Sequence, residues 1–116
     1  MKKVIELAKQ GFESSSQLTP EFSTFFKLFK KEFTKALKGI ECTKIKISRG
    51  HFYINGFFTN HTGQTYYFSF SDARDCSFDH IPNLMYRTAK DYKDYRGGAN
   101  QWVTFDENLV SNLNLN

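Results

Sequence analysis

Apolar side chains recur every three or four positions between residues 19 and 40, and lysines occupy many of the positions between them. This spacing places one apolar stripe along a helix, as in helices that cover a sheet. Thr19 can cap the first turn, Pro20 suits the first helical position, and Gly39 can end the helix. The sequence therefore predicts a long amphipathic helix over residues 19–38. Its apolar stripe consists of Phe22, Phe25, Phe26, Phe29, Phe33, Ala36, Leu37 and Ile40.

Alternating polar and apolar positions follow and predict strands. The predicted strands are residues 45–47, 51–59, 64–71 and 84–89. Short polar connections join them as antiparallel neighbours. One face of the second and third strands is strongly apolar, so we expect the long helix to pack on it through its phenylalanine-rich stripe. The other face carries Tyr53, Phe57 and Tyr67. It is either covered by another part of the chain, such as the C-terminal helix, or open to stack bases or anchor a protein.

Shorter helices are predicted at both ends of the chain. Residues 3–10 have apolar side chains on one side, with Gly11 as the stop. Thr104 and Glu107 fit the capping-box pattern before a short closing helix that contains Phe105, Leu109 and Leu113. We therefore expect a single α+β domain over residues 1–116, with an antiparallel sheet of about four strands packed against the long helix.

The charge of the chain, which is +4 at pH 7, is concentrated in its helical half. Lys30, Lys31, Lys35 and Lys38 would share the exposed face of the long helix, where they could attract phosphate. An ordinary solvated helix face has the same composition. Two cysteines make no disulfide framework, and no stretch approaches the roughly 20 apolar residues of a membrane span. We expect a cytoplasmic protein with no membrane association.

A polar segment between the third and fourth predicted strands contains Asp72, Asp75 and Asp79. Such carboxylates could gather around a divalent cation for phosphodiester cleavage. Cys76 and His80 lie among them, but their spacing matches neither a zinc site nor a nucleophile with its base. Aspartate is also an ordinary turn residue. We therefore expect no cofactor, no metal site and no catalytic residue, and a metal-dependent nuclease or hydrolase stays the alternative.

Basic and aromatic residues alternate after the fourth predicted strand. This mixture suits a phosphate-bearing strand or an acidic protein surface. Asp91 and Asp94 dilute the positive charge, and a surface crossover held by tyrosine packing and local ion pairs is the structural alternative. Together with the helix lysines, the candidate binding residues are His51, Arg74, Arg87, Lys90, Tyr92, Lys93, Tyr95, Arg96 and Asn100.

Four segments carry a resemblance to a known group of proteins. They are RGHFYINGFF (residues 49–58), YFSFSDAR (67–74), YRTAK (86–90) and DYRGGAN (94–100). Residues 49–105 resemble a family of small uncharacterised proteins encoded in phages and mobile elements of bacteria. The resemblance implies a small accessory protein, a context in which inhibitors of host defence and nucleic-acid-associated proteins are frequent. It carries over no catalytic residue.

The function expected from these observations is that of a non-enzymatic binding protein of phage or mobile-element origin in a bacterial cytoplasm. It would occupy a nucleic-acid-binding or protein surface, as an anti-CRISPR inhibitor of host defence does. The partner, protein or nucleic acid, is left open. Besides the nuclease, the sequence leaves one further alternative, an oligomeric structural or assembly component that associates through the face with Tyr53, Phe57 and Tyr67.

Overall fold

Two helices precede a five-stranded sheet in the computed structural model, which describes residues 1–9, 20–51, 53–70 and 83–115. The helices are α1 (Lys2–Lys9) and α2 (Pro20–Gly39). The strands are β1 (Thr43–Arg49), β2 (Ile54–Thr59), β3 (Thr65–Phe70), β4 (Leu84–Ala89) and β5 (Gln101–Val103). The predicted α+β class is confirmed. The predicted cap Thr19 lies outside the described residues.

The strands form an antiparallel meander in the order β1-β2-β3-β4-β5. The turn between β2 and β3 is built on Asn60, a buried residue whose Oδ1 accepts hydrogen bonds from the backbone N–H groups of Thr62 and Gln64 over 3.0 and 2.9 Å. Gly63 takes a positive φ of 90° there, a conformation that glycine adopts without a steric penalty. This turn pairs Phe57 with Tyr67 and thereby fixes which side chains share a face.

The Phe stripe of α2 packs on one face of this sheet. The ring of Phe33 lies edge-on to that of Phe68 with centroids 5.0 Å apart, and Phe25 lies 6.3 Å from Phe70. The fully buried side chains of α2 are Phe22, Phe25, Phe29, Phe33 and Leu37. Burial of each such side chain contributes about 2–3 kcal/mol of transfer free energy, so this contact is a major part of the core.

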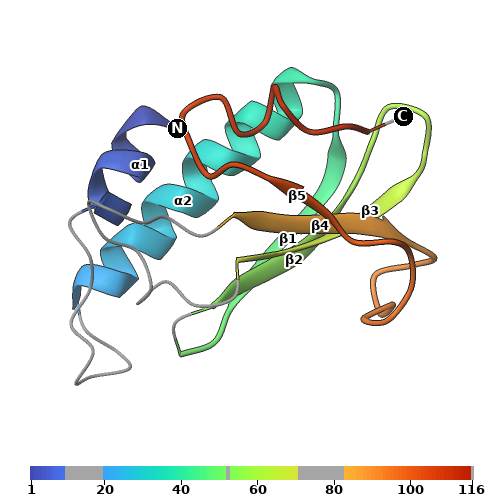
Figure 1. Ribbon diagram of the computed structural model, residues 1–116, viewed down its shortest axis with the longest axis horizontal. Coiled ribbons are helices and arrows are strands. Elements are labelled where there is room, and N and C mark those ends of the chain that lie inside the picture. Colours follow the sequence, from blue (N-terminus) through green and yellow to red (C-terminus); the bar gives the residue numbers. More distant parts are fainter. Residues whose placement is uncertain (10–19, 52, 71–82, 116) are drawn as a thin grey trace.

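The C-terminal segment covers the same face beside α2 (Figure 1). Phe105 stacks on Phe70 at 4.5 Å and on Phe29 at 5.9 Å. The predicted closing helix is wrong, because the described residues after β5 form a series of turns. The carboxylate of Asp106 accepts a hydrogen bond from the N–H of Asn108 over 2.8 Å. Local side-chain bonds of this kind compete with the helix, and Asn and Ser are weak helix formers.

Two further predictions about the sheet are corrected. The second strand begins at Ile54 and not at residue 51, because the N–H of Gly50 bonds the carbonyl of Tyr53 over 3.1 Å and closes a turn. The sheet has a fifth strand, β5, where the sequence indicated an irregular segment. Three residues are too few to show a period, so the pattern of hydrophobic positions did not reveal it.

Neither described helix has the length and apolarity needed to cross a membrane.

Candidate binding surface

The sheet has a second face, on the side away from α2, and rows of cross-strand partners run over it, two of which frame the candidate surface. In one row the cross-strand partners are Lys46 on β1, Phe57 on β2, Tyr67 on β3 and Arg87 on β4. Residues that pair across antiparallel strands project to the same side of a sheet. The neighbouring row, which we call the open row, consists of Ser48, Asn55, Ser69, Met85 and Trp102.

The β4–β5 loop (residues 90–100) folds over the first row. The ring of Phe57 lies 5.3 Å from that of Tyr92 and 5.4 Å from that of Tyr95. The Tyr92 hydroxyl is also 2.7 Å from Oγ1 of Thr59, a hydrogen-bond distance. Phe57 is consequently only 1% exposed, although it lies on the face that α2 does not cover. Half of the second face is thus closed by the chain itself, by this loop and not by the C-terminal helix that the sequence suggested.

Arg87 on β4 attaches the loop to the sheet. It is 3% exposed, and its Nη2 donates a hydrogen bond to the backbone carbonyl of Asp94 over 2.9 Å. Its Nη1 donates to the carbonyl of Thr88 over 3.2 Å, and its guanidinium lies 4.6 Å above the ring of Tyr67. A buried arginine is tolerated where its donors are bonded and an aromatic face is near. The guanidinium therefore ties the loop to the sheet and is withdrawn from solvent.

Asp94 holds the loop in its own conformation. One carboxylate oxygen accepts from the N–H of Lys90 over 2.9 Å, and the other accepts from Arg96 and Gly97 over 3.1 and 2.8 Å. These backbone bonds, with a smaller contribution from the nearby Arg87 charge, lower the pKa of Asp94 from 3.8 to about 2. The Asp94 carboxylate, which the sequence predicts to dilute the positive charge of this segment, is therefore ionised and occupied by hydrogen bonds to the loop's own backbone.

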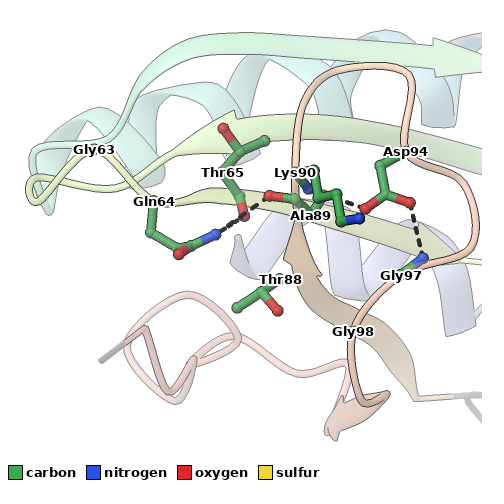
Figure 2. Close-up of a pocket in the computed structure, with 9 residues that line it drawn as sticks. All are labelled: Gly63, Gln64, Thr65, Thr88, Ala89, Lys90, Asp94, Gly97 and Gly98. Atoms are coloured by element: carbon green, nitrogen blue, oxygen red, sulfur yellow. Dashed lines mark hydrogen bonds between the residues drawn. The ribbon is translucent and has the colours of Figure 1, made fainter.

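A pocket of about 540 Å³ lies where the loop meets the β2–β3 turn (Figure 2). Several of its polar groups bond one another, since Nε2 of Gln64 donates to the carbonyls of Thr65 and Ala89 over 2.9 and 3.3 Å. Gly98 lines it with a positive φ of 76°, and a Cβ there would meet the carbonyl oxygen of Thr88. The pocket marks the close approach of loop and strand.

The other half of the second face is open and aromatic. Tyr53, Tyr95 and Trp102 are 42%, 58% and 62% exposed, against at most a few per cent for the rings of the core. Tyr95 packs edge-on against Phe57 and Tyr67 and so stands where the closed half ends. The open row runs from β1 to Trp102 on the edge strand β5.

The structure separates the predicted binding residues into groups. Lys90, Lys93, Tyr95, Arg96 and Asn100 are exposed together on the β4–β5 loop, whereas Tyr92 is half-buried beneath it. His51 is exposed in the turn between β1 and β2. Arg87, which the sequence predicts to be part of a binding surface, is instead buried. Arg74 lies outside the described residues, as do Asp72, Asp75 and Asp79.

The lysine face of α2 lies on the opposite side of the sheet from the loop. Lys30, Lys31, Lys35 and Lys38 are exposed there and line a shallow groove with Lys27 and Thr34. Because α2 packs on one face and the loop on the other, one flat ligand cannot contact both groups. The helix lysines and the loop are therefore two separate candidate surfaces.

Trp102 and Met85 were missed as candidate residues. They are cross-strand partners, and both belong to the open row. Their position depends on β5, whose three residues give no periodic signal. The one sequence feature that pointed to them was the presence of the chain's single tryptophan next to a basic and aromatic segment.

Comparison with protein-family models, curated proteins and solved structures finds no match to this chain. The resemblance of residues 49–105 to phage and mobile-element proteins thus stays a prediction. No cluster of three or more His, Cys, Asp or Glu side chains that could hold a metal ion occurs within residues 1–9, 20–51, 53–70 and 83–115. The proposed Asp72, Asp75 and Asp79 site falls in the gap between these ranges.

Proposed function

We propose that this protein is a non-enzymatic binding protein that acts through the open half of its second face. The exposure of Tyr53, Tyr95 and Trp102 carries the proposal. The thirteen phenylalanines and the other large apolar residues supply an extensive core, and the exposed large apolar side chains in the described residues are these three and Ile40. Three exposed aromatic rings on the same side of one sheet are typical of an interaction site.

The rigidity of this face also supports binding. The open row crosses all five paired strands, from Ser48 on β1 to Trp102 on β5. The loop beside it is fixed by the hydrogen bonds of Arg87 and Asp94. A surface that is ordered before binding loses little conformational entropy when the partner arrives. The buried guanidinium and the carboxylate therefore serve the surface by holding Tyr95 in place.

We place binding on the second face and not on the lysine face of α2. The α2 groove is lined by five lysines and one threonine, without an aromatic side chain. Exposed lysines contribute screened, sequence-independent attraction and little contact area. The second face combines positive charge with large rigid rings, which contribute most of the energy in known interfaces.

The resemblance of residues 49–105 supports the wider setting of this proposal. A small accessory protein from a phage or mobile element, acting in the bacterial cytoplasm, would bind a host component and block it. An inhibitor of host defence, such as an anti-CRISPR protein, is the form of this proposal that the sequence favours. The open aromatic half is the surface that we assign to that inhibition.

An affinity purification from bacterial lysate tests the proposal. The wild-type protein and the Tyr53→Ala/Trp102→Ala variant serve as baits, each with and without nuclease treatment. Ile40→Ala is the matched control, since Ile40 is a 38% exposed apolar residue between α2 and β1. We expect the double variant to lose the captured partner and the control to keep it. Equal capture by all three baits would contradict the proposal.

A further inference from the structure

We propose that the occupant of the open half is a single-stranded nucleic acid. Its bases would stack on Tyr53, Tyr95 and Trp102, and its phosphates would lie against Lys46, Lys93 and Arg96. This inference rests on the function proposed above and names its partner.

The charges on the second face favour an anionic occupant. Lys46 pairs with Phe57 across β1 and β2 and is exposed, and the loop exposes Lys90, Lys93 and Arg96. Two acidic residues accompany them in the loop, and both carboxylates bond its own backbone. Asp94 accepts three N–H groups, and Asp91 accepts the N–H of Lys93 over 2.8 Å. The two carboxylates stay ionised, but the four exposed cations outnumber them, so this side of the sheet carries a net positive charge that complements a phosphate backbone.

The geometry of the rings suits unpaired bases. Tyr53 precedes β2, and Trp102 lies on β5, three strands away. Strands are spaced by about 4.8 Å, so these rings stand roughly 14 Å apart across the sheet, with Tyr95 on the loop beside the row. The residues between them, Asn55, Ser69 and Met85, are half-buried and form the sheet surface between the rings. A sheet surface with separated rings can accept successive bases without reading their edges.

A duplex fits this surface poorly, because the faces of its bases are already stacked on one another and only the base edges in the grooves and the backbone are exposed. A protein partner is the main competing occupant. Tyr, Trp, Arg and Met are also common in protein interfaces. The exposed cations of the loop favour nucleic acid over a protein partner, since exposed lysines are depleted from protein interfaces and are usual along a nucleic-acid backbone.

Fluorescence anisotropy with labelled oligothymidylate and oligouridylate of about 15 nucleotides tests the inference. The same sequence as a duplex is the comparison ligand. We expect the protein to bind both single strands more tightly than the duplex. Trp102→Ala and Tyr53→Ala should each weaken single-strand binding by about tenfold or more, because each removes one stacking platform. With about three phosphate contacts, log Kd should rise with log salt with a slope of about 2.

Matched charge variants locate the binding side. Lys46→Gln/Arg96→Gln removes two cations from the second face, and Lys31→Gln/Lys35→Gln removes two from α2. We expect only the first pair to weaken binding and to reduce the salt slope by about 1.4, roughly 0.7 for each lost phosphate contact. Circular dichroism of all variants confirms that each is folded. An effect confined to the α2 pair would overturn the inference.

The outcomes also separate this inference from the proposed function. If no single strand binds, and a nuclease-resistant protein is captured in a Trp102-dependent manner, the inference is wrong and the proposed function stands. If single strands bind and duplex binds equally well, stacking on the three rings is wrong. If substitution of Tyr53 and Trp102 changes neither oligonucleotide binding nor lysate capture, both proposals are wrong.

Discussion

Nη2 of Arg87 donates a hydrogen bond over 2.9 Å to the carbonyl oxygen of Asp94, seven residues further along the chain. This bond joins the last long strand of the sheet to the middle of the loop that follows it. The loop is thereby kept on the second face, with Tyr92 and Tyr95 against Phe57. The boundary between the closed half and the open half of this face depends on that contact.

Replacement of Arg87 by methionine should destabilise the protein. Methionine keeps much of the length and apolar volume but leaves the Asp94 carbonyl without its donor. We expect the free energy of unfolding to fall by about 2–3 kcal/mol. Urea denaturation followed by circular dichroism measures the change. Lys93→Met, on the exposed side of the same loop, should stay within about 0.5 kcal/mol of the wild type. Equal effects of the two substitutions would contradict the anchoring role of Arg87.

Asp94 should make the stability of the protein depend on pH in the acid range. Its folded pKa of about 2 lies below its ordinary value of 3.8. The carboxylate therefore stabilises the folded state fully above pH 3.8, and this contribution is lost as the pH falls through about 2. Urea midpoints at pH 5, 3 and 2 should fall less steeply for Asp94→Asn than for the wild type. Identical pH profiles would show that the three backbone bonds do not hold the carboxylate.

Alanine substitutions at Gly98 and Gly63 form a matched pair that tests how closely the loop approaches β4. Both have a positive φ, of 76° and 90°, so alanine is strained at either position. A Cβ at Gly98 would also meet the carbonyl oxygen of Thr88, whereas none of the atoms around Gly63 lies within 4 Å of such a Cβ. We expect Gly63→Ala to cost about 1 kcal/mol and Gly98→Ala to cost clearly more. Urea denaturation measures both, and equal losses would contradict the contact with Thr88.

Phe105 should behave as a core residue even though no helix contains it. It is 2% exposed and stacks on Phe70 and Phe29. Phe105→Ala removes a buried ring and leaves a cavity, at a cost of about 3–5 kcal/mol. Trp102→Ala, three residues earlier and 62% exposed, should cost much less. Thermal and urea unfolding of the two variants provide the comparison. A stable Phe105→Ala variant would show that the C-terminal segment is not part of the core.

Cys42 should be protected from thiol reagents in the folded protein. Burial leaves it 2% exposed and raises the pKa of its thiol above 9.0, so little thiolate forms near neutral pH. In a Cys76→Ser background, alkylation by iodoacetamide at pH 8 should be slow until urea unfolds the chain. Mass spectrometry after a timed exposure measures the modified fraction. Rapid alkylation without denaturant would contradict the burial of Cys42.

Much of the fold follows from the hydrophobic pattern. The helix stripe and the alternation along β2 and β3 are long enough to show their periods, so the face that receives α2 was predicted correctly. The turn before Ile54, the strand β5 and the C-terminal turns were not predicted. Each is decided by a few local hydrogen bonds, such as that of Asp106 with Asn108, which no periodicity reports.

The candidate surface was predictable in composition but not in arrangement. The mixture of basic and aromatic residues drew attention to the β4–β5 loop, and Tyr95 and Arg96 are indeed exposed there. The sequence could not show that Arg87 lies beneath the loop, since arginine is usually exposed. It also could not place Trp102 beside Met85, because that contact requires the register of β5.

The fluorescence of Trp102 tests the central claim most directly, since it is the only tryptophan in the chain. At 62% exposure its indole should be quenched readily by acrylamide in the free protein. We expect saturating oligothymidylate to lower its emission and to protect it from acrylamide, with a midpoint equal to the Kd from anisotropy. Binding that leaves the emission and the acrylamide quenching of Trp102 unchanged would place the partner elsewhere and contradict the assignment of the open half as the binding surface.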